Sequence, residues 1–166
     1  MRLETERLVL SPLGGPDKAD HARASGRPAD AARDTRAAET QWREHGFGPW
    51  AIRDRRDNTF LGCAELRSAP AGLEGIEAGE VEAGWWVSEE RRNDGIATEA
   101  MQAALADLWS RTELDLVTAY ISGENEPSRR VTAKLGFTVR GPGRGRSGEA
   151  MTVYELRRGV SEKSGA

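Results

Sequence analysis

The chain has 166 residues, enough for one domain with a buried core and too few for two comfortable ones. Its longest apolar runs cover only a few residues, so the sequence predicts neither a membrane span nor a secretory signal. One cysteine excludes an internal disulfide and leaves no cluster for a metal site, and a net charge of −3 argues against a nucleic-acid partner. We expect a single cytoplasmic domain over residues 1–160, with a disordered tail at 161–166.

The first strand is followed by a poorly patterned region. Arg7–Leu13 alternates apolar and polar residues, which is typical of a short strand. Gly14–Gly46 is rich in Ala, Arg and Asp, with high helix propensity but no wide apolar stripe before Trp42. We expect one or two short, loosely packed helices there.

Regular strands dominate the middle of the chain. Trp50–Arg53 and Phe60–Leu66 are predicted strands joined by a polar hairpin turn, and a loop rich in Gly, Ala and Glu follows them. Glu80–Ser88 is the next strand. Its alternation places Glu82 and Trp86 on the same face of the sheet.

Two helices and three further strands complete the chain. Apolar residues at helical spacing predict an amphipathic helix over Ala97–Trp109. Glu126–Phe137 is the second helix, with Pro127 in its first turn and Gly136 at its C-terminal cap. Strands are expected at Leu116–Ile121, Phe137–Arg140 and Met151–Arg157. The fold class is therefore a mixed α/β domain whose helices cover a central sheet of about seven strands.

The stretch from Ser88 to Ala100 joins a strand directly to a helix. The N–H groups at the start of a helix are unpaired and lie at the positive end of its dipole, so they bind phosphate where side chains leave room. Gly95 and Ala97 leave that room, and Arg92 adds a positive charge. The dinucleotide fingerprint and the nucleotide-binding P-loop are both missing from the sequence.

This turn and its neighbours match a known pattern. Arg92–Ala97 (RNDGIA) resembles the (Q/R)-x-x-G-x-(G/A) acyl-CoA signature of the GNAT superfamily of N-acetyltransferases. Asn125–Phe137 (NEPSRRVTAKLGF) is similar to the N-x-x-S-x-R-V-x-x-K-L-G-F segment of the branch that contains ribosomal-protein alanine N-acetyltransferases. The opening strand and the two strands after Gly46 resemble the same branch.

The resemblance implies a mostly antiparallel sheet that splays open between its fourth and fifth strands, Glu80–Ser88 and Leu116–Ile121. Acetyl-CoA is then the donor, with its pantetheine arm in the opening, and a primary amine is the acceptor; no metal is expected. The residues implied to bind acetyl-CoA are Trp86, Val87, Arg92, Asn93, Asp94, Gly95, Ile96, Ala97, Thr98 and Asn125.

Two residues are candidates for the chemistry. Glu82 lies ten residues before Arg92, where several members of the superfamily place a catalytic glutamate that takes a proton from the amine. It is equally compatible with a solvent-facing charge on a strand. The tyrosine that many members use to protonate the leaving thiolate is replaced by Thr132, and the branch implies Ser128 as its substitute. Ser128 is also a favourable polar residue for the first turn of a helix.

Three departures from the branch pattern bear on these expectations. Asn93 stands where the branch has glycine, a cheap replacement because asparagine tolerates a positive φ. Asp94 puts a negative charge where a basic residue is common, which predicts weaker acetyl-CoA binding unless its carboxylate turns outward. The segment Gly14–Gly46 is shorter and more polar than the acceptor wall of the branch. The acceptor pocket is therefore open, completed by a second subunit of a homodimer, or poorly formed.

The leading hypothesis is an acetyl-CoA-dependent N-acetyltransferase that acts on a protein N-terminus or a small-molecule amine. Its rival is a non-catalytic acyl-CoA-binding or regulatory module whose acceptor side has eroded, which the polar segment and Asp94 would explain. Both hypotheses predict binding of coenzyme A. Only release of its thiol in the presence of an amine separates them.

Overall fold

The structure, a computed structural model that describes residues 1–159, is built on one eight-stranded sheet. The strand order is β1-β2-β3-β4-β5-β6-β8-β7, and only the β5–β6 pair is parallel among the described strands. The strands are β1 (Leu3–Glu4), β2 (Leu8–Pro12), β3 (Trp50–Asp54), β4 (Phe60–Ser68), β5 (Val81–Val87), β6 (Leu116–Ser122), β7 (Thr138–Arg144) and β8 (Ala150–Arg157). The tail expected at 161–166 lies outside the described residues.

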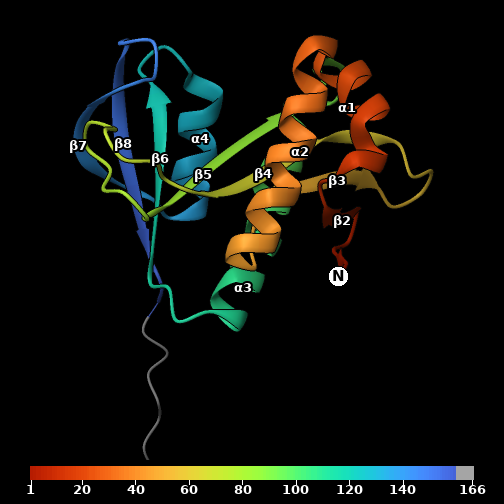
Figure 1. Ribbon diagram of the computed structural model, residues 1–166, viewed down its shortest axis with the longest axis horizontal. Helices are drawn as coiled ribbons and strands as arrows, with labels where there is room; N and C mark the ends of the chain where they lie inside the picture. Colours follow the sequence, from red (N-terminus) through yellow and green to blue (C-terminus); the bar gives the residue numbers. More distant parts are fainter. Residues whose placement is uncertain (160–166) are drawn as a thin grey trace, which may run out of the picture.

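The predicted fold class is confirmed, and each predicted strand is present (Figure 1). The additional strand, β1, has only two residues, too few to show an alternating pattern in the sequence. β7 continues to Arg144, beyond the predicted end at Arg140. Its second half contains Pro142, a residue that sheets tolerate mainly in edge strands, and β7 is the last strand of this sheet.

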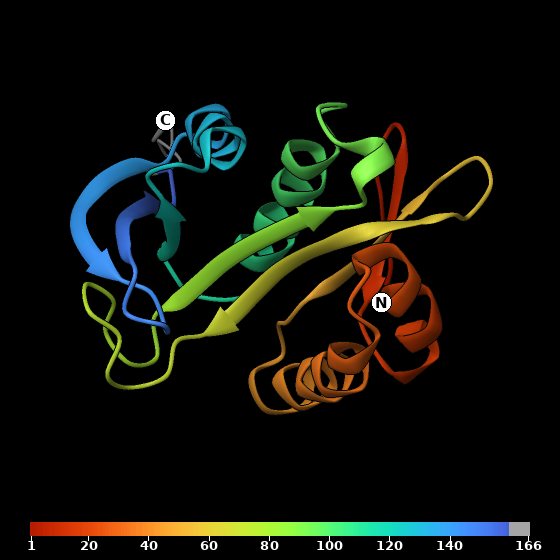
Figure 2. The ribbon, with the colours of Figure 1, turned by 90° about the horizontal axis from the view of Figure 1, so that it is seen from above.

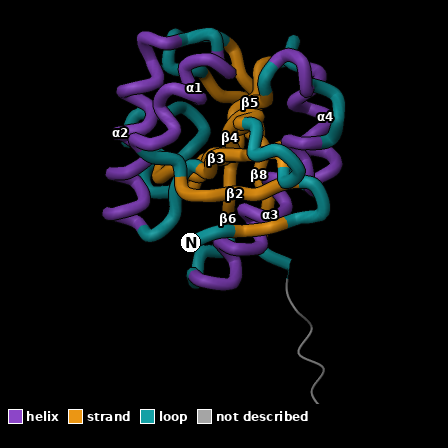
Figure 3. Tube along the Cα trace, turned by 90° about the vertical axis from the view of Figure 1, so that its right-hand side faces the viewer, coloured by secondary structure: helices purple, strands orange, loops and turns teal. Residues whose placement is uncertain are grey.

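Helices cover both faces of the sheet (Figures 2 and 3). On one face lie α3 (Ile96–Arg111), after the short 3₁₀ helix η2 (Glu89–Arg91), and α4 (Glu126–Leu135). On the other lie η1 (Gly15–Asp17), α1 (Lys18–Ser25) and α2 (Pro28–His45). The main core lies between α3 and the sheet, and α3 contributes to it at the predicted helical spacing. No helix within residues 1–159 is long and apolar enough to cross a membrane.

Two α-helices lie in Gly14–Gly46, as predicted, but the prediction that both are short is wrong. α2 alone has 18 residues, and the residues that it buries are Ala31, Thr35 and Ala38. Their spacing is helical, but none is a large apolar residue, so the buried face leaves no apolar stripe in the sequence. Small side chains let the helix backbone lie close to its neighbours and pack densely without bulky residues.

The sheet opens between β5 and β6. Only Val81 with Val117 and Glu82 with Thr118 pair between these strands, although each strand has seven residues. The Thr118 hydroxyl also donates to the Val81 carbonyl at 3.2 Å, at the closed end of the opening. Beyond Glu82, β5 has no partner on this side within the described part of the chain. This confirms the splay expected between the fourth and fifth predicted strands (Figure 1).

Candidate functional site

A cavity of about 760 Å³ lies between the end of β5, the start of α3 and the first turns of α4. Of the residues predicted to bind the donor, those that line it are Trp86, Val87, Arg92, Asn93, Gly95, Ile96, Ala97, Thr98 and Asn125. Ser128, the predicted acid, lines it as well, whereas Asp94 and Glu82 do not. The cavity thus gathers most of the predicted residues from three separate segments of the chain.

The turn before α3 depends on two residues in the left-handed region. Asn93 has a φ of 63° and Gly95 a φ of 75°. Asparagine is one of the few residues with a side chain that visit this region readily, so the expected backbone of Asn93 is confirmed. Gly95 forms the N-cap of α3 and needs no side chain of its own to do so.

The first turn of α3 presents backbone donors to the cavity. The first intrahelical bond runs from the N–H of Glu99 to the carbonyl of Gly95 at 3.1 Å, so the preceding N–H groups have no partner in the helix. No described side chain caps this end. Ile96 is buried in the core and fixes the turn, while Ala97 and Thr98 lie at the cavity. Unpaired N–H groups and the positive end of the helix dipole therefore suit an anion.

Residues of the turn between β1 and β2 hold the turn before α3 in place. Arg7 donates to the Asp94 carbonyl at 2.8 Å and to the Glu99 carboxylate at 2.7 Å. The Thr5 hydroxyl donates to the same carboxylate at 2.6 Å. Burial alone would raise the pKa of Glu99, but the hydrogen bonds from Thr5 and Arg7 lower it on balance. The sequence does not predict these contacts, because about ninety residues of chain separate Thr5 and Arg7 from the residues that they bind.

Asp94 is turned away from the cavity. Its carboxylate accepts from Nε of Arg91 at 3.2 Å, and Arg91 also donates to Asp54 at 3.1 Å. The backbone N–H of Arg56 and the guanidinium groups of Arg56 and Arg91 lower the pKa of Asp54 to about 2. Asp94 therefore meets the condition under which we expected it not to weaken donor binding, and its charge helps to fix the turn.

The backbone of β5 alternates between the β4 side and the opening. The N–H of Ser88 donates to a β4 carbonyl at 2.7 Å, whereas the carbonyl of Val81 faces β6. Because the N–H and C=O of one residue lie on the same side and alternate along a strand, those of Trp85 and Val87 face the opening. Trp86 lines the cavity too, but its backbone faces β4. Of Trp86 and Val87, Val87 therefore offers its backbone N–H to the opening and Trp86 does not.

Asn125 and Ser128 are linked at the start of α4. The Asn125 side chain accepts from the backbone N–H of Ser128 at 3.1 Å and so caps the helix. This bond uses the backbone of Ser128 and not its hydroxyl. Thr132, which stands at the tyrosine position, is buried, and its hydroxyl donates to the Arg129 carbonyl at 2.7 Å. Ser128 is therefore the α4 hydroxyl that lines the cavity.

Basic residues of α4 add to the cavity. Arg130 and Lys134 line it one helical turn apart, whereas Arg129 does not. From the sequence, the roles of Arg129 and Arg130 stay open and Lys134 is expected to have only a structural role. The signal that could have found Lys134 is its four-residue spacing from Arg130. Arg91 and Arg92 line the cavity as well, so four basic side chains surround it.

These elements form one recognised domain. The family model described as an acetyltransferase (GNAT) domain matches residues 8–138. The chain belongs to the GNAT acetyltransferase family. The matched range contains every element that surrounds the cavity, from β5 through the donor turn to α4.

Solved structures share this GNAT fold. A protein of Bordetella pertussis assigned to the GnaT acetyltransferase family is 26% identical with a TM-score of 0.82, over 93% of this chain and 98% of that one. The ribosomal-protein-S5-alanine acetyltransferase of Vibrio fischeri is 14% identical with a TM-score of 0.75, over 95% and 96%. Mycobacterium smegmatis RimJ, in complex with CoA-disulfide, is 21% identical with a TM-score of 0.71, over 96% and 85%. The neighbours thus include the branch that the sequence resembles.

Glu82 lies at the closed end of the GNAT opening and not in the cavity. Its carboxylate accepts from Arg146 of the β7–β8 loop at 3.1 Å, and its side chain is 15% exposed. Tyr120 of β6 lies nearby, since burial and then the charge of Glu82 raise the pKa of this phenol. The Tyr120 hydroxyl donates to the carbonyl of Glu74. Glu82 is thus partly buried and already held by a guanidinium group.

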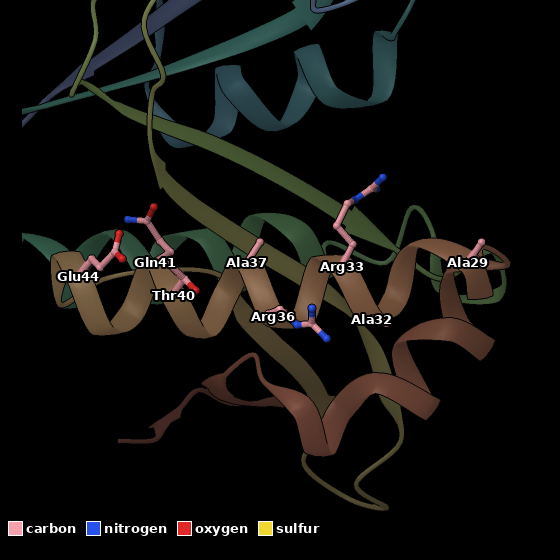
Figure 4. A pocket seen from close by; sticks show the side chains of 8 residues that line it. All are labelled: Ala29, Ala32, Arg33, Arg36, Ala37, Thr40, Gln41 and Glu44. Atoms are coloured by element: carbon pink, nitrogen blue, oxygen red, sulfur yellow. The ribbon is translucent and has the colours of Figure 1, made fainter.

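A second hollow, of about 620 Å³, runs along α2 and is lined by residues of that helix (Figure 4). Arg33 and Arg36 project to different sides of the helix. Gln41 ties α2 to the sheet, because its side-chain oxygen accepts from the N–H of Ser68 at 3.3 Å. α2 is therefore a regular helix joined to the sheet, in the segment that the resemblance implies as the acceptor wall. Completion of the acceptor side by a second subunit stays a prediction.

Proposed function

We propose that this protein transfers the acetyl group of acetyl-CoA to a primary amine, with both substrates bound at once. The observation that carries the proposal is the cavity at the splay, which joins a free strand edge to an uncapped helix start. An extended arm with amide groups suits the edge, and a pyrophosphate suits the helix start. The complex of M. smegmatis RimJ with CoA-disulfide supports a CoA-based donor.

Separate parts of the cavity would hold the two ends of the donor. The N–H groups of Ala97 and Thr98 would bind the pyrophosphate, and Arg92, Arg130 and Lys134 would add positive charge around it. The open edge of β5 would pair with the amides of the pantetheine arm as a neighbouring strand does. Because the phosphates lie at the end of β5, the thioester would reach toward the closed end of the opening.

Transfer requires a neutral amine, a polarised carbonyl and a protonated leaving group. The amine nitrogen attacks the thioester carbonyl carbon and the C–S bond breaks, while a backbone N–H of the β5 edge stabilises the charge that develops on oxygen. A carboxylate at the closed end would take the proton from the amine. Glu82 is the sequence-predicted candidate, but Arg146 must first release it. Ser128 would protonate the thiolate, a modest aid because a thiol has a pKa of about 8.5.

The acceptor is proposed to be a protein N-terminus or a small-molecule amine. The fold similarity to a ribosomal-protein-S5-alanine acetyltransferase supports the first. The hollow along α2 is open enough for either.

Calorimetry and a substrate screen test this function. We expect purified protein to bind coenzyme A and acetyl-CoA, and to release thiol in the presence of N-terminal peptides, polyamines or aminoglycosides. Absence of coenzyme A binding would refute the proposal. Binding with no thiol release across the panel would instead favour a non-catalytic acyl-CoA-binding module.

A further inference from the structure

The floor of the acceptor side carries a second carboxylate that the sequence did not single out. In the register of β4 and β5, Glu65 lies opposite Gly84, and Arg67 lies opposite Glu82. Directly opposed residues place their side chains on the same face of a sheet, so Glu65 shares a face with Glu82. The side chain of Glu65 is 20% exposed. It is partly buried and still reaches solvent.

Gly84 leaves room for the Glu65 carboxylate beside the opening. A Cβ atom at Gly84 would lie 3.4 Å from Oε2 of Glu65, so this oxygen lies over the glycine. Gly84 belongs to the part of β5 beyond Glu82, where pairing with β6 has ended. With the phosphates at the far end of β5, as proposed above, the thioester would lie near this glycine. Oε2 of Glu65 would then lie beside the place where the amine must arrive.

The carboxylates of Glu82 and Glu65 differ in how their arginine partners contact them. Glu82 accepts a hydrogen bond from Arg146 at 3.1 Å. Glu65 forms an ion pair with Arg67, in which Nη2 lies 3.0 Å from Oε1. The arginine thus engages one oxygen of Glu65, and the oxygen over Gly84 is the other one. An acceptor amine can reach Oε2 of Glu65 without displacing either arginine.

The charges around Glu65 suit a proton acceptor. Burial raises the pKa of Glu65, Arg67 opposes this effect, and Asp34 of α2 and Glu82 add to it, with Arg27 opposing them. A general base works best when its pKa lies near the working pH. The net direction is upward, so Glu65 is a stronger base than a free glutamate.

We infer that Glu65 is the catalytic base of this centre, and that its Oε2 atom binds the ammonium group of the acceptor and takes one proton from it. The inference rests on the proposed acetyl transfer. The freed lone pair on nitrogen forms the bond to the thioester carbonyl carbon, and the C–S electron pair leaves with sulfur. The nitrogen's second proton balances the one that the thiolate gains, and Glu65 returns the first to water. Glu82 then keeps Arg146 in place.

Substitutions at the two carboxylates test this assignment. The variants are Glu65→Gln, Glu65→Asp and Glu82→Gln, with Glu113→Gln as an exposed control after α3. For each, calorimetry gives the affinity for acetyl-CoA, thermal unfolding reports folding, and thiol release with the amine panel gives kcat and KM across pH.

We expect Glu65→Gln to lower kcat about 100-fold, as loss of a general base does, with acetyl-CoA affinity unchanged. The fall in kcat toward acidic pH should also move to higher pH, because without the base only the acceptor that is already a neutral amine can react. Glu65→Asp should keep part of the rate and that acidic fall. Glu82→Gln should lose less than Glu65→Gln.

The outcomes separate this inference from the proposed function. A wild-type protein that is silent with every amine overturns both. An active wild type with a Glu65→Gln variant of normal rate and pH profile overturns the role of Glu65 alone, as does an acidic fall that only Glu82→Gln moves to higher pH. If Glu65→Gln unfolds, a folded Glu65→Asp variant with an unchanged rate and pH profile overturns it instead.

Discussion

The donor side and the acceptor side of the opening are built from different material. On the proposed donor side the proposed contacts are mainly backbone groups, the first N–H groups of α3 and the open edge of β5, with positive charge added by basic side chains. On the proposed acceptor side we infer that the contacts are side chains, carried by α2 and by strand residues such as Glu65. A site made of backbone groups lies within one short segment and allows few residue types there. It can therefore be recognised as a motif in the sequence. A site of side chains from separate segments leaves none.

The largest effect is expected on the donor side, from Gly95→Val. A β-branched residue at a φ of 75° is strongly strained, and its side chain would enter the space beside Arg7. We expect acetyl-CoA affinity to fall about 100-fold by calorimetry. Gly141→Val is the control, because Gly141 has an ordinary φ and open space around its Cβ position. Equal affinities in the two variants would show that the turn does not depend on glycine.

A stability effect without loss of donor binding is expected from Ala38→Leu. Ala38 is buried where α2 meets the sheet, so a larger side chain overpacks the contact and costs about 1–3 kcal/mol. Thermal unfolding should move down by several degrees, and the KM for the amine should rise while acetyl-CoA affinity stays constant. Arg43→Leu, at an exposed position of the same helix that does not line the hollow along α2, should leave all three unchanged. Weaker acetyl-CoA binding in Ala38→Leu would show that the packing of α2 also affects the donor site, and would contradict the separation of the two sides.

Asp54→Asn should destabilise the protein in a pH-dependent way. The pKa of Asp54 is lowered from an ordinary 3.8 to about 2, so its ionised form stabilises the fold. This contribution is complete above the ordinary value and is lost as the pH falls through about 2. We expect a melting temperature lower by about 2–6 °C at neutral pH, and convergence with the wild type in acid. Asp115→Asn, at an exposed position before β6, is the control. A difference that persists unchanged in strong acid would contradict the ionic origin.

The smallest effect is expected from Asp94→Lys. The carboxylate of Asp94 contacts Arg91 and lies outside the cavity, so reversing its charge should change acetyl-CoA affinity by no more than about twofold. Glu90→Lys makes the same change of charge on the exposed η2 helix and measures the general electrostatic effect. A clear tightening in Asp94→Lys beyond that control would mean that the carboxylate opposes the donor.

The sequence predicted what depends on local chemistry. Gly95 and Asn93 mark a turn that few other residues allow, and Pro127 and Gly136 mark the ends of α4. It failed where neighbours in space decide. The buried face of α2 is made of small residues, so only its contact with the sheet shows it to be a core face.

The same limit applies inside the candidate site. The alternation of β5 shows which residues share an edge, but the hydrogen bond from Ser88 is needed to show that this edge belongs to Trp85 and Val87. In the sequence, Glu65 looks like an exposed charged residue of a strand. Only the strand register shows that it lies opposite Gly84.

The unpaired edge of β5 also bears on how the protein behaves without a ligand. An exposed strand edge is a template for any extended chain, and here it carries Trp85 and Val87. The ligand-free protein therefore offers other molecules a place to add a strand. Concentrated protein should therefore aggregate on storage unless a ligand occupies this edge. Adding coenzyme A before concentration should reduce the aggregation.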